Sequence, residues 1–316
     1  MTLTGFVLLY IAATIAIGVI AATRVKNTSD FALAGRSLPL PMVITATFAT
    51  WFGSETILGL PGRFIESGIA GVIEEPFGSG MALILVGTFF AHKLYKQNIL
   101  TLGDYYRDRY GRSVELLCSV AIVISYLGWV GAQVTALGLV INLITEGAVS
   151  MTTGMVIGAA VVLAYTMVGG MWSVAMTDFV QMIVIVVGLV AILWFATDLA
   201  GGMDKVVDYA RGRDLFHAFP EPTTTGWLFW ISAAMTMMIG SIPQQDVFQR
   251  VMSAKNLPTA VAGPILGGSF YILFAFVPMF IVVAAILVMP DAAEKMLSED
   301  PQQLLPTLVR DYMPMW

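Results

Sequence analysis

The chain is 316 residues long; 58% of these residues are hydrophobic and only 12% are charged. A soluble domain is nearer half apolar and a quarter charged, and it must cover its surface with polar side chains, which so few charges cannot do. The net charge of −5 lacks the basic excess of a nucleic-acid-binding protein, so no nucleic-acid partner is expected. Composition therefore predicts an all-α polytopic membrane protein whose solvent is the lipid bilayer.

Eight apolar segments are each long enough to cross a hydrocarbon core of about 30 Å. They cover residues 3–23, 40–62, 69–92, 114–145, 150–168, 176–200, 226–248 and 260–288. The first segment lacks a preceding basic region and is followed by Arg24 and Lys26, which is typical of a retained helix and not of a cleaved signal peptide. We therefore expect about eight transmembrane helices, followed by a polar tail that forms short helices.

Basic residues in the loops predict the orientation. With the N-terminus outside, the inner loops hold ten of them: Arg24, Lys26, Arg36, Lys93, Lys96, Arg107, Arg109, Arg112, Arg250 and Lys255. The outer side holds the remaining six: Arg63, Lys205, Arg211, Arg213, Lys295 and Arg310. Because inner loops carry the excess of Lys and Arg, this distribution predicts a multi-pass protein of the plasma or inner membrane with its N-terminus outside.

The second segment has the composition of an interrupted helix. Residues 49–62 bring three glycines, a proline, several hydroxyl groups and the carboxylate of Glu55 into one crossing. Irregular backbone at membrane depth frees carbonyl groups and helix ends, and such segments mark the binding site in many secondary transporters. Small residues also serve close helix packing, but a carboxylate within a membrane needs a partner or a function.

The third segment begins with Glu74, Glu75 and Pro76. Two readings of the carboxylates are open. They lie at the outer boundary in water, or one of them lies deeper and faces the same cavity as Glu55, where it would attract cations.

The seventh segment contains a second candidate break. Pro243 interrupts the helical hydrogen bonds and is followed at once by the amides of Gln244 and Gln245. The alternative is a plain helix end on the cytoplasmic side, with Asp246 solvated beside Arg250.

Three further side chains have both a structural and a functional reading. Asp178 opens the sixth segment, where it is either a helix cap or part of an ion path. Trp51 and Trp129 are either ordinary core or interface aromatics, or walls of a cavity that holds a cation by its charge.

Several stretches, taken in order and spacing, resemble the sodium:solute symporter family, which includes proline, sodium/galactose, sialic acid and high-affinity choline transporters. The stretches are residues 30–38, 49–62, 101–106, 168–181 and 248–251. The resemblance implies a LeuT-type inverted-repeat transporter fold within a single membrane domain. Residues 1–39 would be the leading helix and inner loop, 40–200 the first repeat and 226–316 the start of the second. The fold would be incomplete, because the chain stops before the eighth core helix, and we expect a fragment of a longer protein.

The resemblance also implies a coupling ion, sodium, and no other cofactor. The backbone carbonyls of Ala49 and Phe52 match the positions that hold sodium on the broken helix. Asp178 matches an aspartate that lines the inner sodium path and in some members belongs to a second sodium site. The hydroxyl residues that complete the first site in the family would lie beyond Trp316.

The substrate implied by the resemblance is a small polar or cationic organic solute. The chain is most similar to the choline branch, and Trp51 and Trp129 match two aromatic cage positions, but Ser79 and Gln244 stand at two others. Sugar-binding relatives carry a glutamate at the position of Glu75, which favours a polar solute. The candidate substrate-binding residues are Trp51, Ser54, Glu55, Thr56, Glu75, Trp129, Gln133, Gln244 and Gln245.

Sodium-coupled symport by alternating access is the function we expect. A sensor domain built on the same fold is the alternative, and a channel is a further one. An enzyme is not expected, because Cys118 is the sole cysteine, His92 and His217 are far apart, and no nucleophile elbow or phosphate-binding loop is present.

Overall fold

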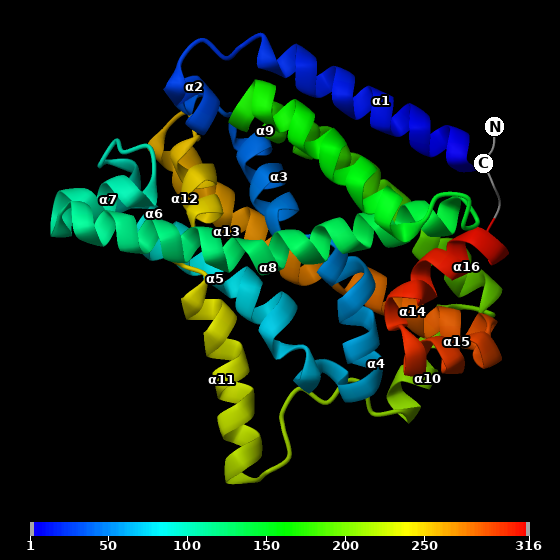
Figure 1. Cartoon of the computed structure of the whole chain (residues 1–316). Helices are drawn as coiled ribbons and strands as arrows, with labels where there is room; N and C mark the ends of the chain where they lie inside the picture. Colours follow the sequence, from blue (N-terminus) through cyan, green and yellow to red (C-terminus); the bar gives the residue numbers. More distant parts are fainter. Residues whose placement is uncertain (1–2, 314–316) are drawn as a thin grey trace. The chain divides into compact units, whose positions relative to one another are not determined.

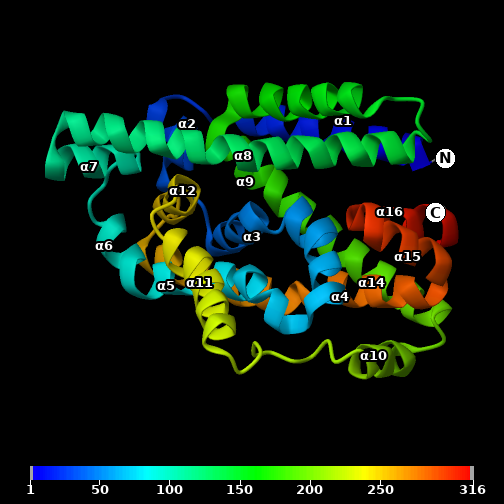
Figure 2. The same cartoon turned by 60° about the horizontal axis from the view of Figure 1, so that its bottom comes forward.

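The computed structural model describes residues 3–313. Within these residues the regular structure is helical, apart from an isolated β-bridge between Leu38 and Ala254. The all-α class predicted from composition is confirmed. Figure 1 and Figure 2 show the helices in chain order from two directions.

Sixteen α-helices occur in the described part of the chain. They are α1 (Leu3–Ala22), α2 (Thr28–Leu33), α3 (Leu40–Trp51), α4 (Leu60–Gly71), α5 (Ser79–Leu85), α6 (Ala91–Tyr95), α7 (Leu102–Tyr110), α8 (Arg112–Ile144), α9 (Met151–Leu199), α10 (Met203–Gly212), α11 (Thr224–Gly240), α12 (Gln245–Met252), α13 (Leu257–Phe274), α14 (Phe276–Val288), α15 (Pro290–Glu299) and α16 (Leu304–Tyr312). Short 3-10 or π segments are η1 (Ala34–Arg36), η2 (Glu55–Gly59), η3 (Ile73–Gly78), η4 (Val86–Phe90) and η5 (Pro301–Gln303). The polar tail forms short helices, as expected.

Five helical runs are long and apolar enough to cross a membrane, or six when α11 and α12 are counted as one broken span. The runs are Gly5–Ala22, Ile73–Tyr95, Arg112–Ile144, Met151–Leu199 and Leu257–Val288. Every one of the eight predicted segments is largely helical. The number falls below eight because residues 150–168 and 176–200 share the helix α9, and because residues 40–62 and 226–248 are each divided by a break.

The long helix α9 contains the fifth and sixth predicted segments. Its 49 residues would measure about 74 Å if straight, more than twice the thickness of a hydrocarbon core. Gly170 interrupts it, with φ 50° and ψ −140°, a conformation that side-chain-bearing residues rarely adopt. The two spans are therefore separated by a single residue.

The second predicted segment has a different end from the one expected. Helix α3 stops at Trp51, and after the π-helical turn η2 the chain continues as α4 to Gly71. The predicted end at residue 62 is wrong, because Pro61 lies in the first turn of α4, where proline starts a helix instead of ending it.

The chain forms two compact units, each assembled from segments far apart in sequence. The first unit comprises Met1–Thr50, Leu83–Met182 and Ile242–Gly268, and the second comprises Trp51–Ala82, Ile183–Ser241 and Ser269–Trp316. The predicted repeats, 40–200 and 226–316, divide the chain by sequence order, whereas the two units divide it by contacts between residues. The units therefore do not test the predicted repeats.

Close helix contacts in the first unit depend on small residues. Helix α1 runs beside the first half of α9 (Figure 1 and Figure 2), and the Ser173 hydroxyl donates a 2.5 Å hydrogen bond to the Gly18 carbonyl. A β-carbon on Gly154 of α9 would lie 3.1 Å from the carbonyl oxygen of Gly138 on α8. Small residues let helix backbones approach in this way, which is the main source of packing where lipid is as apolar as the side chains.

The second unit is centred on α14. Its apolar residues Pro278, Met279, Ile281, Val282, Val283, Ala284 and Ala285 are buried. Helices α4, α10, α15 and α16 pack around it. The turn η2, which follows the break, also packs against α14.

Gly170→Ala tests the break in α9. A β-carbon at this position would lie directly against the carbonyl oxygen of Phe31, and the backbone conformation adds strain of about 1–3 kcal/mol. We expect a lower unfolding temperature and a loss of monodisperse protein in detergent. Gly188→Ala, on the same helix with no distant atom within 4 Å, is the matched control and should be neutral or slightly stabilising. Equal stability of the two variants would contradict the assignment of Gly170 as the break.

Candidate functional site

The helical ladder is interrupted directly after Trp51. The Gly53 N–H donates to the Trp51 carbonyl at 2.8 Å, whereas in a regular helix it would donate to the carbonyl of Ala49. The interrupted helix predicted from residues 49–62 is confirmed. Ala49 and Phe52, whose carbonyls are the expected sodium ligands, lie immediately before and within this break.

A threonine side chain lies within hydrogen-bonding distance of the carbonyl group at the break. The hydroxyl of Thr56 lies 3.1 Å from the Trp51 carbonyl oxygen, to which it can donate. The helix resumes here as the π-helical turn η2, in which the Leu60 N–H donates to the carbonyl of Glu55. Single π turns of this kind occur frequently at functional sites.

The same hydroxyl takes part in a buried cluster with Glu75 and Tyr271. Thr56 Oγ1 lies 2.7 Å from Glu75 Oε1 and 2.9 Å from the Tyr271 hydroxyl oxygen. The Tyr271 hydroxyl itself donates to Glu75 Oε1. Thr56 and Tyr271 are fully buried, and Glu75 is partly exposed. Since buried polar groups are costly unless paired, this cluster is a stable arrangement that the surrounding apolar residues protect.

Aromatic contacts hold Tyr271 in place. The ring of Phe52, which is 2% exposed, meets the Tyr271 ring edge-on at 6.0 Å between centroids. Phe52 also packs against Phe274, at 5.3 Å. Edge-to-face pairs contribute about 0.5–1.5 kcal/mol beyond the burial of their area, so Phe52 ties α13 to the break.

The two adjacent glutamates have different environments. Glu74 forms a 3.3 Å ion pair with Arg63, and the side chains are 33% and 50% exposed, so the pair contributes little to stability. Glu75 points into the buried cluster. Glu74 and Glu75 are both partly exposed, and they differ in their partners. The hydrogen bonds with two buried hydroxyl groups favour the deeper position for Glu75, and the ion pair with Arg63 favours the outer position for Glu74.

Three other predicted site residues of the second unit, Trp51, Ser54 and Glu55, lie at the break. Glu55 is exposed, and Trp51 and Ser54 are partly exposed. Their predicted role in solute binding stays a prediction.

In the first unit, Trp129 lies one helical turn from a tyrosine that binds the second break. Trp129 is 39% exposed and meets the Tyr126 ring edge-on at 6.4 Å. The Tyr126 hydroxyl donates a 2.6 Å hydrogen bond to Asp246 Oδ1 and accepts one of 3.1 Å from the Asp246 N–H. Asp246 is thus bound to α8, a partner that the sequence did not indicate.

The glutamines of the second break lie where the helix restarts. α11 ends at Gly240 and α12 begins at Gln245, so the predicted interruption is confirmed. Gln245 Oε1 accepts a 2.9 Å hydrogen bond from the Leu102 N–H at the start of α7, and Gln244 occupies the position before α12. Binding of solute by these two residues, and by the partly buried Gln133 on α8, stays a prediction.

Three of the stretches that carry the family resemblance pack into one cluster. Leu33, Leu102, Phe248 and Met252 form a buried apolar core, and the Gln249 amide donates a 2.5 Å hydrogen bond to the Ala32 carbonyl. These stretches therefore serve packing between segments that are far apart in the sequence. Asp178 lies in α9 outside this cluster, partly buried.

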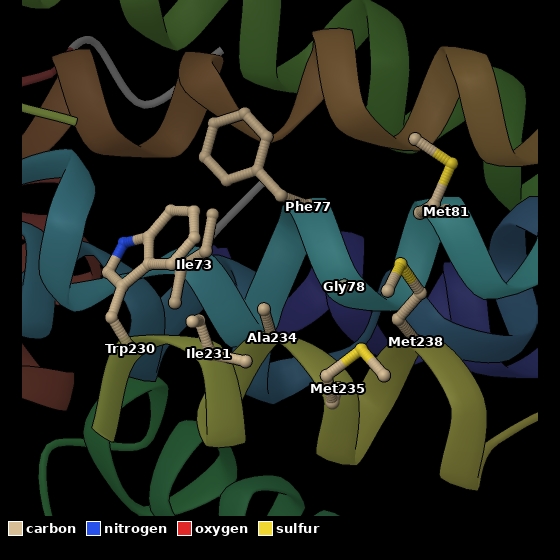
Figure 3. Close-up of a pocket in the computed structure, with 9 residues that line it drawn as sticks. All are labelled: Ile73, Phe77, Gly78, Met81, Trp230, Ile231, Ala234, Met235 and Met238. Atoms are coloured by element: carbon tan, nitrogen blue, oxygen red, sulfur yellow. The ribbon is translucent and has the colours of Figure 1, made fainter. Parts of the chain in front are cut away.

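An apolar pocket of about 310 Å³ opens between η3, α5 and α11. Figure 3 shows its lining: Ile73, Phe77, Gly78, Met81, Trp230, Ile231, Ala234, Met235 and Met238. None of the predicted polar site residues lines it, so it suits an apolar group and not the polar part of a solute.

A family model described as the sodium:solute symporter family matches residues 31–316. The chain belongs to the sodium:solute symporter family. It is 29% identical to high-affinity choline transporter 1 of Caenorhabditis elegans (80% of this chain, 43% of that one) and 30% identical to the Homo sapiens protein (76% and 42%). Sodium/glucose cotransporter 4 of Danio rerio is 27% identical (88% and 45%). The chain thus spans less than half the length of these curated relatives, which are transporters and not enzymes.

The fold agrees with the family. A solved Na+-coupled sialic acid symporter, in a substrate-bound outward-open state, superposes with a TM-score of 0.81 at 19% identity. The match covers 97% of this chain and 65% of that one. The chain therefore has the LeuT-type inverted-repeat fold of a multi-pass membrane protein, as the resemblance implied.

A double-mutant cycle of Tyr126→Phe and Asp246→Asn tests the link between α8 and the second break. Hydrogen bonds to charged groups contribute about 1.5–3 kcal/mol, so we expect a coupling energy in this range in the free energy of unfolding in detergent. Tyr110→Phe replaces Tyr126→Phe in the control cycle, because Tyr110 is 58% exposed. Additive effects in both cycles would show that the hydrogen bond is absent in solution.

Proposed function

We propose that the protein carrying this chain performs sodium-coupled symport of a small polar or cationic organic solute by alternating access. The observation that carries the proposal is the helix broken after Trp51, with Thr56, Glu75 and Tyr271 gathered beside it. Membership of a transporter family and the inverted-repeat fold support it. The protein would lie in the plasma or inner membrane with its N-terminus outside.

Sodium would be the coupling ion, held on this chain by the carbonyls of Ala49 and Phe52. Backbone oxygen atoms suit a hard cation, and broken helices supply them at membrane depth. Asp178 would line the inner part of the ion path. Sodium would favour the outward-open state to the extent that it binds that state more tightly than the inward-open one.

The solute would bind at the break. Its contacts would come from Trp51, Ser54, Glu55, Thr56, Glu75, Trp129, Gln133, Gln244 and Gln245. Two tryptophans suit a cationic group, and the carboxylates and amides suit hydroxyl or amine donors. Along the chain, residues 1–39 would form the leading helix and inner loop, residues 40–200 the first inverted repeat, and residues 226–316 the start of the second repeat.

Uptake into proteoliposomes, with the product of the complete gene, tests the function. Radiolabelled choline, proline, galactose and sialic acid are offered with an inward sodium gradient and with potassium in its place. We expect accumulation of one solute with sodium alone. Uptake that is equal in both conditions would exclude sodium coupling, and passive, non-saturable flux would favour a channel.

Glu75→Gln tests the solute site, and Glu74→Gln is its matched neighbour. Loss of a charged acceptor costs about 1.5–3 kcal/mol, so the KM of the accumulated solute should rise about 10- to 150-fold in Glu75→Gln. Glu74→Gln breaks an exposed ion pair and should change KM less than about threefold. Similar KM values for both variants would remove Glu75 from the site.

A further inference from the structure

The apolar pocket between η3, α5 and α11 has no role in the proposed ion and solute sites. It measures about 310 Å³, and its lining consists of apolar side chains together with Gly78 and the indole of Trp230. All the residues that line it belong to the second unit. Side chains around such a space lack van der Waals partners on one side, so an apolar ligand of matching shape would gain those contacts.

The pocket is continuous with a helix surface that faces lipid. In the described part of the chain, none of the residues of α11 is buried, and Leu228 and Phe229 are 62% and 73% exposed. Ile231 and Met235 line the pocket and are themselves 47% and 41% exposed. Because α11 belongs to an apolar span, a ligand that enters the pocket from this surface comes from the bilayer.

One end of the pocket carries a hydrogen-bond donor without a partner. Among residues 3–313, Nε1 of Trp230 is buried and forms no hydrogen bond. Figure 3 shows Trp230 at the end of the pocket opposite Met81 and Met238, with its ring nitrogen pointing away from them. A buried indole N–H usually has an acceptor, so a ligand that satisfies it carries an acceptor at this end and apolar groups along the rest of the pocket.

The Trp230 end has the composition of a membrane–water interface. Phe219, Trp227 and Trp230 form an aromatic cluster near the start of α11, with ring centroids 5.8, 6.0 and 6.1 Å apart. Tryptophan is enriched at the level of the lipid headgroups, where its ring contacts hydrocarbon and its N–H meets polar groups. From Trp230 to Met238 the helix rises about 12 Å, so the pocket runs from this level into the hydrocarbon region.

We propose that the pocket binds one acyl chain of a membrane glycerophospholipid, whose ester carbonyl accepts the hydrogen bond from Trp230 Nε1. The acyl chain would pass Ile231 and Met235 and end near Met81 and Met238. Flexible methionine side chains suit a ligand without a rigid shape. A transmembrane helix fits the pocket less well, because its backbone carbonyls are used within the helix and would leave the indole N–H unpaired. The proposal goes beyond the proposed function and does not depend on sodium or on the solute.

Photolabelling in nanodiscs tests the site. The product of the complete gene is reconstituted in phosphatidylcholine with a low fraction of phosphatidylcholine that carries a diazirine in the middle of one acyl chain. After irradiation, labelled residues are identified by mass spectrometry. We expect labelling at Met81 and Met238 as well as at Phe229 on the exposed face of α11. Labelling of Phe229 without the two methionines would show that another part of the protein fills the pocket, and would overturn the proposal.

Two substitutions on α11 separate a binding site from ordinary lipid contact. Ile231→Trp fills the pocket from one side and should remove most of the labelling at Met81 and Met238. Leu228→Trp adds the same ring at an exposed position that does not line the pocket, and should leave the labelling of the methionines unchanged. Labelling of Phe229 confirms that each variant is inserted in the bilayer. Equal labelling of the methionines in both variants would mean that no defined site exists.

Trp230→Phe tests the hydrogen bond to the lipid. The substitution keeps an aromatic ring and removes the N–H group. A neutral hydrogen bond changes affinity about fivefold, so labelling of Met81 and Met238 at a low fraction of probe lipid should fall by about that factor. Trp227→Phe, in the same aromatic cluster but outside the pocket lining, is the matched control and should label as the unsubstituted protein does. Unchanged labelling in Trp230→Phe would overturn the assignment of the ester carbonyl to this end.

Discussion

The absence of water in the hydrocarbon core is the constraint on which this structure depends. Every backbone N–H and C=O there needs a partner within the protein, so a helix can be broken only where other groups replace the lost hydrogen bonds. At the first break the Gly53 N–H and the Thr56 hydroxyl both reach the Trp51 carbonyl. The polar residues around it are therefore part of what makes the break stable as well as candidates for binding.

The same constraint explains why apolar burial alone does not hold the chain together. Lipid is as apolar as the side chains, so helices associate through close packing and internal hydrogen bonds. A β-carbon on Gly263 of α13 would lie only 2.4 Å from Cγ1 of Val43 in α3, which is too close for any larger residue at this position. A β-carbon on Gly18 of α1 would likewise lie 2.8 Å from the β-carbon of Tyr165. Large aliphatic residues such as Leu127 and Leu163 are more than half exposed, as expected for faces that meet lipid.

Packing and candidate binding are carried by different residues. The stretches around Leu33, Leu102 and Phe248, which contribute much of the family resemblance, form a buried apolar cluster. The polar residues at the first break form a separate group in the other compact unit. The fold is shared with the solved symporter at 19% identity.

The sequence by itself determined the membrane class, the helical segments and both interruptions. Hydropathy over about 19 residues and the local effects of Gly53 and Pro243 do not depend on distant contacts. It placed the end of the second segment wrongly, because Pro61 can either end or begin a helix and only the neighbouring structure decides which. It also identified Glu75 as a candidate, but left its depth open.

Only the tertiary structure decided the partners. Tyr271 is separated from Glu75 by 196 positions, and Asp246 from Tyr126 by 120, so no periodicity or spacing relates them. Gln245 accepts a hydrogen bond from the backbone N–H of Leu102, 143 positions away, whereas the sequence suggested only a solute as its partner. Such contacts depend on how helices pack, and packing brings together residues that are independent along the chain.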